Sequence, residues 1–224
     1  MSRYRFRLAQ HSENDELRKL LAATSMPGMI GLSFRREPDY FLAEEAGSTS
    51  VETIVAEDVT TDRIVGVGSR AIRKLYVDGN QRLIGYLSNL RGLPEIRSGT
   101  LLARGYRFLR SLHGDGQVPY YVTTIFDDNT LAKEVLTSGR AGLPQYAFYG
   151  RLLTYLIPLQ RRRGYPIHVR RGVAESELTL VESAVNDFNR RHQFAPVYAR
   201  DDLCGVSRLL PGLSKEHFYV AWHN

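Results

Sequence analysis

The chain has 224 residues, of which 43% are hydrophobic and 24% are charged, a composition ordinary for a soluble globular protein. The single cysteine, Cys204, excludes an intramolecular disulfide framework and a zinc site built from cysteines. The apolar run 152–158 is far shorter than the roughly 20 residues of a membrane span. The N-terminus lacks an apolar signal core, so we expect a soluble, cytoplasmic protein.

The net charge of +6 comes mainly from arginine, because only four of the 30 basic residues are lysines. Arginine suits bidentate contact with phosphate, which allows a phosphate-bearing partner. Arginine-rich codon usage explains the same excess. The charge is spread along the chain and no recognition motif accompanies it, so we do not expect nucleic-acid binding.

The first 59 residues predict a strand, two helices and a second strand. Residues 3–8 alternate arginine with apolar residues, which is typical of a half-buried strand. Ser12 and Asp15 form a capping-box pattern that opens a helix with one leucine-lined face. A short helix over 38–46 and a strand over 52–59 follow.

The middle of the chain predicts a long hairpin and then alternating helices and strands. Residues 63–77 and 81–93 are strands joined by a turn at Asp78-Gly79, a strong hairpin signal. The period then changes to that of a helix over 98–113. The remaining elements are a strand at 118–126, a helix at 127–139 and a strand or strand pair at 145–159. This order indicates an α+β fold.

The C-terminal part repeats the opening order of elements. The polar, basic stretch 160–166 is typical of a linker, and residues 167–172 predict a strand. A helix over 175–192, a short helical piece over 194–203 and a strand over 216–224 follow. We interpret this as a weak internal repeat, the start of a second similar domain.

Two stretches and the order of elements over about 1–160 together match a known family. Residues 86–109 combine a strand, a proline, an arginine and a glycine-containing loop that opens a helix. Asn129 and Ala132 form an Asn-x-x-Ala pattern after the strand at 118–126. In these features the chain resembles the GNAT superfamily of acyl-CoA N-acetyltransferases, in particular a bacterial subgroup with two tandem domains. The resemblance implies a mixed, mostly antiparallel central sheet flanked by helices in residues 1–159. It also implies that residues 167–224 are the N-terminal part of a second such domain.

The resemblance implies acetyl-CoA as the acyl donor. In this fold the pantetheine arm lies between two splayed strands and pairs with strand amides. The pyrophosphate lies on free N–H groups where the next helix begins. By position, the cofactor-binding residues would be Asn89, Leu90, Arg91, Arg97, Ser98, Gly99, Thr100, Leu101, Leu102 and Asn129.

Several positions depart from the family's pattern. The family's pyrophosphate loop reads Arg/Gln-x-x-Gly-x-Gly/Ala, whereas this chain has Thr100 and Leu102 at the last two named positions. The tyrosine that many relatives use as general acid is Leu136 here. Asn129 also fits the simpler role of a helix N-cap.

Acyl transfer requires a neutral amine, a route for its proton and donors for the developing oxyanion. Backbone N–H groups near Asn89 and Leu90 are candidate donors. The candidate catalytic side chains are Glu57 as base and Tyr146 and Tyr149 as acids, with Glu95 as a further base. Either carboxylate also fits a solvated surface role.

The sequence therefore predicts an acetyl-CoA-dependent N-acetyltransferase that acts on a primary amine of a small acceptor by direct attack on the thioester. Two alternatives stay open: an N-acyltransferase that uses acyl carrier protein donors, and a non-catalytic CoA-binding sensor. The six histidines lack metal-ligand spacing, so we expect no metal. The acceptor and the oligomeric state are left open.

Overall fold

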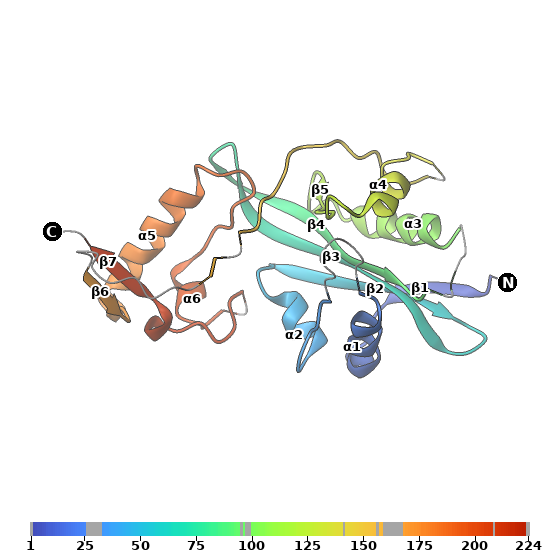
Figure 1. The fold of residues 1–224 in the computed structure, drawn as a ribbon, viewed down its shortest axis with the longest axis horizontal. Helices are drawn as coiled ribbons and strands as arrows, with labels where there is room; N and C mark the ends of the chain where they lie inside the picture. The colour runs from blue at the N-terminus through green and yellow to red at the C-terminus, as the bar shows by residue number, and fades with distance from the viewer. Residues whose placement is uncertain are drawn as a thin grey trace. The chain divides into compact units, whose positions relative to one another are not determined.

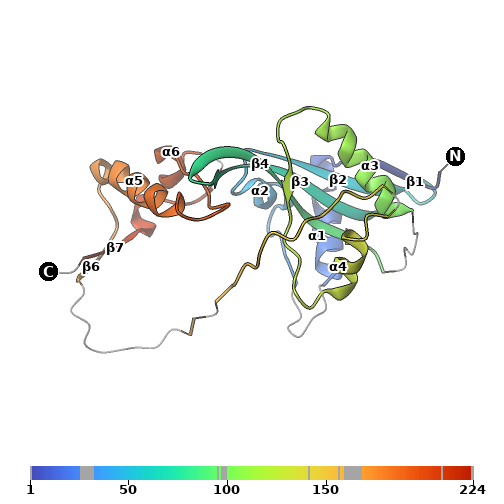
Figure 2. The same ribbon diagram turned by 90° about the horizontal axis from the view of Figure 1, so that it is seen from above.

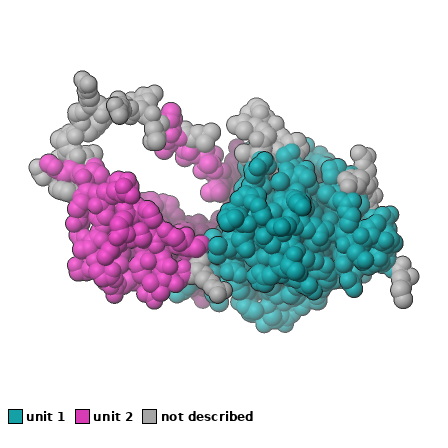
Figure 3. Space-filling view, turned by 90° about the horizontal axis from the view of Figure 1, so that it is seen from below, with its two compact units in different colours: residues 1–74, 83–148 teal, residues 75–82, 149–224 magenta. Residues whose placement is uncertain are grey.

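The computed structural model describes residues 2–25, 33–94, 96, 100–140, 142–155, 157–158, 168–207 and 209–222. The chain forms two compact units (Figure 3). Unit 1 comprises residues 1–74 and 83–148, and unit 2 comprises residues 75–82 and 149–224.

The main sheet has five strands in the order β1-β2-β3-β4-β5 (Figure 1). The strands β1, β2 and β3 pair antiparallel in sequence, and β5 pairs parallel to β4. The predicted mixed, mostly antiparallel sheet is thereby confirmed. The bounds are β1 Tyr4–Leu8, β2 Ser50–Asp58, β3 Arg63–Val77, β4 Asn80–Gly92 and β5 Tyr121–Val122.

Helices cover both faces of this sheet. The helices α1 (Asn14–Ala23) and α2 (Tyr40–Glu45) lie on one face, and α3 (Leu101–His113) lies on the other (Figures 1 and 2). A fourth helix, α4 (Thr130–Leu136), follows β5. The sequence predicts all four helices.

The core of unit 1 lies between the sheet and the first two helices. Its members are Leu17, Leu20, Leu21, Tyr40, Val55, Ile64 and Val67. The three leucines recur at helical spacing, so they form one apolar stripe that α1 presents to the sheet. Each fully buried leucine side chain contributes about 1.5–3 kcal/mol. Through Tyr40, this packing also holds α2 against the sheet.

The start of α1 is capped differently from the prediction. A single-turn helix, η1 (His11–Glu13), precedes α1, and the backbone N–H of Gln10 donates to Glu13 Oε2 at 2.7 Å. The predicted Ser12–Asp15 pattern is therefore displaced by the Gln10–Glu13 contact. The Asp78-Gly79 turn has φ values of 50° and 73°, the positive pair that a tight hairpin requires.

Two predicted strands differ in the structure. The expected strand over 118–126 is reduced to Tyr121–Val122. The predicted strand over 145–159 is wrong for its described residues, 145–155 and 157–158, which form no strand. Their apolar side chains are exposed, with Phe148 83% and Leu152 79% accessible. An apolar pattern makes a strand only where a neighbouring strand accepts its backbone hydrogen bonds.

Unit 2 contains a small two-stranded sheet, in which β6 (His168–Arg171) pairs antiparallel with β7 (Tyr219–Trp222). Between the strands lie η2 (Glu175–Glu177), α5 (Leu178–Asn189), α6 (Arg200–Leu203) and η3 (Lys215–His217). This is the predicted order of strand, helix, helix and strand. The predicted linker, residues 160–166, lies outside the described residues.

The tip of the long hairpin belongs to unit 2. The backbone N–H of Tyr76 donates to the carbonyl of Ala195, and that of Phe194 donates to the carbonyl of Tyr76, both at 2.8 Å. These bonds join the hairpin tip, residues 75–82, to residues 194 and 195. Unit 2 is therefore assembled from two stretches that are far apart in the sequence.

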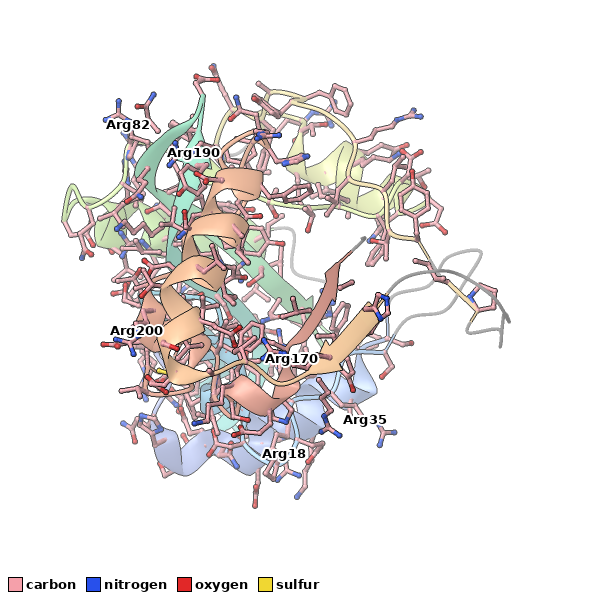
Figure 4. The ribbon with its side chains drawn as sticks, turned by 90° about the vertical axis from the view of Figure 1, so that its left-hand side faces the viewer. Arg18, Arg35, Arg82, Arg170, Arg190 and Arg200 are labelled. Atoms are coloured by element: carbon pink, nitrogen blue, oxygen red, sulfur yellow. The ribbon has the colours of Figure 1, made fainter. Side chains whose placement is uncertain are left out.

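Arginines of unit 2 extend from its surface (Figure 4). Arg170 pairs with Glu177 at 2.6 Å, Arg200 with Glu175 at 2.6 Å and Arg190 with Asp187 at 3.4 Å. These basic side chains are thus balanced by nearby carboxylates. Within the described part of the chain, no helix is long and apolar enough to cross a membrane, and no cluster of three metal-ligating side chains occurs.

Candidate active site between diverging strands

The strands β4 and β5 pair at only two positions, Gly85 with Tyr121 and Tyr86 with Val122. A Cβ atom at Gly85 would come within 2.1 Å of the Tyr121 ring, so glycine is required for this close pairing. Beyond Tyr86, β4 continues to Gly92 while β5 ends. Thr123 Oγ1 donates to the Leu87 carbonyl at 2.8 Å as the two chains part.

A cavity of about 700 Å³ lies where the two chains part. It is lined by residues 86–92 of β4 and by residues 123–126, which follow β5. Apolar side chains of α3 and α4 form much of its wall: Leu101, Leu102, Leu109, Ala132 and Leu136. The volume and the apolar wall are typical of a small-molecule site.

One end of the cavity is polar and is built on α2. Glu44, which is only 7% exposed, accepts a hydrogen bond from Asn89 Nδ2. Its carboxylate also forms an ion pair with Arg36, whose Nε lies 2.9 Å away. Asn89 Nδ2 also lies 3.4 Å from Ser69 Oγ. The φ of Asn89 is 53°, a left-handed conformation that asparagine tolerates better than most residues. Glu44 and Ser69 therefore hold a kink in β4 beside the cavity.

Three arginines also line the cavity. The Arg73 guanidinium lies over the Tyr86 ring, 4.2 Å from its centroid, and Nε donates to Ser48 Oγ at 3.3 Å. Arg91 Nε is buried without a hydrogen-bond partner in the described structure. Burial lowers the pKa of Arg73 and of Arg91, although arginine stays protonated in proteins. The described lining therefore holds three arginines, including Arg36, and one carboxylate, that of Glu44, so its net charge is positive.

A tyrosine pair borders the apolar wall. Tyr106 of α3 lines the cavity, and its hydroxyl lies 2.9 Å from that of Tyr146. Burial raises the pKa of both hydroxyls. Both tyrosines are therefore neutral at physiological pH, and each can donate a proton or a hydrogen bond.

Comparisons with solved structures place this arrangement of strands and helices. The aminoglycoside N-acetyltransferase AAC(6')-Iy in complex with CoA is 17% identical and superposes with a TM-score of 0.52. The match covers 73% of this chain and 97% of that one. The chain has the GNAT fold. The predicted GNAT resemblance is thereby confirmed at the level of fold.

A second GNAT structure agrees. The aminoglycoside antibiotic 6'-N-acetyltransferase AAC(6')-Ih from Acinetobacter baumannii matches with 13% identity and a TM-score of 0.50. That match covers 70% of this chain and 99% of the other. No protein-family model and no curated protein sequence matches the chain. The likeness is therefore one of fold rather than of close sequence.

Most of the predicted cofactor-binding residues that the structure describes line the cavity of the GNAT fold. These are Asn89, Leu90, Arg91, Leu101, Leu102 and Asn129. Thr100 is the N-cap residue of α3. Asn129 also caps α4, because its Oδ1 accepts from the backbone N–H of Ala132 at 3.1 Å. The predicted residues Glu95, Arg97, Ser98 and Gly99 lie outside the described residues.

None of the predicted catalytic side chains, Glu57, Tyr146 and Tyr149, is part of the described lining of the cavity. Glu57 is absent from the described lining of the cavity and accepts from Arg5 Nη2 at 2.6 Å and Arg7 Nε at 3.0 Å. Hydrogen bonds from Arg7 and Arg5 lower the pKa of Glu57, which weakens it as a base. Tyr149 belongs to unit 2, where its ring packs 5.0 Å from Phe194. Tyr146 reaches the cavity through Tyr106.

The sequence does not predict Glu44, Arg73 or Tyr106 as residues of the cavity lining. Glu44 lies in a predicted helix, but the pattern does not reveal which carboxylate of that helix is buried. Tyr106 falls on the apolar stripe of α3, where a hydroxyl among leucines was the available signal. The place of Arg73 depends on a contact with Tyr86 of the next strand, which local sequence does not encode.

Proposed function

We propose that this chain is an acetyl-CoA-dependent N-acetyltransferase that acts on a primary amine of a small acceptor. The divergence of β4 and β5 into a cavity of about 700 Å³ carries the proposal. A strand edge without a partner strand pairs with an extended, amide-containing ligand, which describes the pantetheine arm. The first residues of α3 line the same cavity, and a helix N-terminus attracts phosphate.

The lining residues fit such a ligand. The wall along α3 and α4 is apolar, which suits the hydrocarbon parts of the arm. The edges of residues 87–92 and 123–126 would hold its amides. Arg91, whose buried Nε has no partner in the described structure, would meet an acceptor atom of the bound ligand.

The chemistry then requires few side chains. Acetyl-CoA supplies an acetyl group activated as a thioester. The kink at Asn89, held by Glu44 and Ser69, would present backbone N–H groups of Asn89 and Leu90 to the carbonyl oxygen, which gains negative charge as the amine attacks.

Tyr106 would donate a proton to the departing sulfur, so that CoA leaves as the thiol. The proton that the attacking amine loses would return to Tyr106 through solvent and restore its hydroxyl. Its raised pKa keeps the hydroxyl protonated, and its partner Tyr146 orients it. The proton donor would then lie on α3, in place of the tyrosine that many relatives have at the position of Leu136. The structures with CoA and with aminoglycoside-acetylating activity that share this fold support the choice of donor and of an amine acceptor.

A transfer assay tests the proposal. The purified full chain would be mixed with acetyl-CoA and pools of small primary amines, with thiol release and acetylated products measured. We expect release only with particular amines. Tyr106→Phe should lower kcat about 10- to 100-fold while acetyl-CoA binding is retained. Tyr120→Phe is the matched control, because Tyr120 is absent from the described lining. Binding of acetyl-CoA without transfer to any amine would contradict the enzymatic proposal.

A further inference from the structure

Arg73 lies at the closed end of the gap between β4 and β5. Its guanidinium stacks on Tyr86, a position at which the two strands are still paired. The first turn of α3 follows the other end of β4, beyond Gly92. Five residues, with the kink at Asn89 among them, separate Tyr86 from Gly92, a span of at most about 20 Å. Arg73 is therefore remote from the end where phosphates of the cofactor would lie.

The surroundings of Arg73 leave its charge without a full partner. Its Nε donates to Ser48 Oγ, and no carboxylate among the described residues forms an ion pair with it. Glu44 interacts electrostatically with Arg73, but its carboxylate is already engaged by Arg36 and Asn89. Two arginines thus share one carboxylate at this end of the cavity. A half-buried cation in this position favours an anionic ligand group.

We propose that the acceptor amine carries an anionic group, a carboxylate or a phosphate, and that Arg73 binds it. Glu44 joins this end to the proposed reaction centre, because it hydrogen-bonds Asn89 and interacts electrostatically with Arg73. An acceptor with its amine at Asn89 and its anionic group at Arg73 would span this polar end. This inference rests on the proposed transferase function and narrows its substrate class.

Matched pairs of acceptors test the inference. One arm compares amino acids with their carboxamides, and the other compares amino-sugar phosphates with the unphosphorylated amino sugars. We expect the anionic member of at least one arm to be acetylated about 10- to 100-fold more efficiently in kcat/KM. The arm in which the preference appears identifies carboxylate or phosphate. Equal efficiency within every pair would overturn the inference while leaving transfer itself established.

Variants assign the preference to Arg73. Arg73→Gln should remove the preference for the anionic acceptor and leave the dissociation constant of acetyl-CoA unchanged. Arg73→Lys should keep part of the preference, because it retains the charge but not the bidentate geometry. Arg63→Gln, at an exposed position on the same strand, is the control and should change neither quantity.

Acetyl-CoA binding to the same variants separates the possible failures. A loss of acetyl-CoA affinity in folded Arg73→Gln would assign Arg73 to the cofactor and overturn the inference. An absence of acetyl-CoA binding by the unsubstituted protein would instead overturn the proposed function. If Arg73→Gln does not fold, the Lys variant and the acceptor pairs still decide the question.

Discussion

Two regions of the chain, residues 4–58 and 168–222, follow the same order of elements. Each begins with a strand, passes through a single-turn helix into an α-helix and a short second helix, and ends with a strand antiparallel to the first; the second region adds the single-turn helix η3 before its last strand. In each region a glutamate caps the single-turn helix. Glu13 accepts from the Gln10 backbone at 2.7 Å, and Glu177 accepts from the Ala174 backbone at 2.6 Å. An arginine of the preceding strand pairs with each glutamate.

The two regions differ in what surrounds them. Four and eight residues after Glu13, Leu17 and Leu21 are fully buried. The same spacing after Glu177 reaches Val181 and Val185, which are only partly buried. Strand β2 has β3 along its other edge, whereas the described residues give β7 no second neighbour. Local signals therefore set the elements, while depth of burial depends on strands supplied elsewhere in the chain. We propose that 168–222 is the opening of a second domain of the same kind.

The largest expected effect contrasts the two helices. Leu21→Ala should destabilise unit 1 by about 2–5 kcal/mol, because it leaves a cavity in a closed core. Val185→Ala should cost unit 2 about 1 kcal/mol, since its side chain is only partly buried. Urea unfolding measures both changes. Circular dichroism follows the unfolding of each variant. Equal losses would contradict the contrast.

The next effect concerns the kink of β4, which distinguishes the cavity-bearing region. Asn89→Ala removes the contact to Glu44 and leaves a residue that tolerates a φ of 53° less well than asparagine, so it should weaken acetyl-CoA binding about tenfold. Asn89→Gly keeps the backbone free to adopt this φ, so it should lose less affinity. Isothermal calorimetry measures both constants. An alanine variant that binds acetyl-CoA as tightly as the unsubstituted protein would show that the kink does not contribute to acetyl-CoA binding.

Much of the fold is predictable from the sequence, because its signals are local. The strand predicted over 63–77, which ends at the Asp78-Gly79 turn, has the observed bounds of β3. The leucine stripe of α1 predicts a helix with the correct buried face. The strand predicted at 145–159 fails over its described residues because its pattern does not reveal that none of the described strands pairs with them.

The candidate site is only partly predictable for a related reason. Asn89, Leu90 and Leu102 follow from the position of β4 and α3 in the chain. Glu44 and Arg73 acquire their role from neighbours more than ten residues away, such as Asn89 and Tyr86. A single sequence does not encode which distant side chains meet, so these residues emerge only from the fold.

A smaller effect tests the shared helix caps through pH. The hydrogen bond from Arg7 lowers the pKa of Glu13 below its usual value of 4.5, and the Ala174 N–H does the same for Glu177. A carboxyl with a depressed folded pKa stabilises the fold above its unfolded pKa, and this stability is lost as the pH falls through the folded pKa. Glu13→Gln should cost about 1 kcal/mol at pH 7 and flatten the pH dependence below pH 4.5.

Glu177→Gln should change the pH dependence less than Glu13→Gln, because its carboxyl is more exposed. Thermal unfolding of both variants between pH 3 and pH 7 measures the difference. A larger effect at Glu177 than at Glu13 would contradict the account of unequal surroundings.

The smallest expected effect lies on the surface of unit 2. Arg200→Gln removes an exposed ion pair with Glu175 and should cost less than about 0.5 kcal/mol. Unfolding at low and high salt should give nearly the same value for the variant. A loss of more than 1 kcal/mol would show that this surface contributes more to stability than its exposure implies.

The most direct test of the central claim is thermal unfolding with and without millimolar acetyl-CoA, with ATP as the nucleotide control. At 100 times its dissociation constant, the ligand should add about 2.7 kcal/mol and raise the midpoint of unit 1 by several degrees. The account predicts this shift with acetyl-CoA and CoA and none with ATP. No shift with acetyl-CoA, or an equal shift with ATP, would contradict the assignment of the cavity.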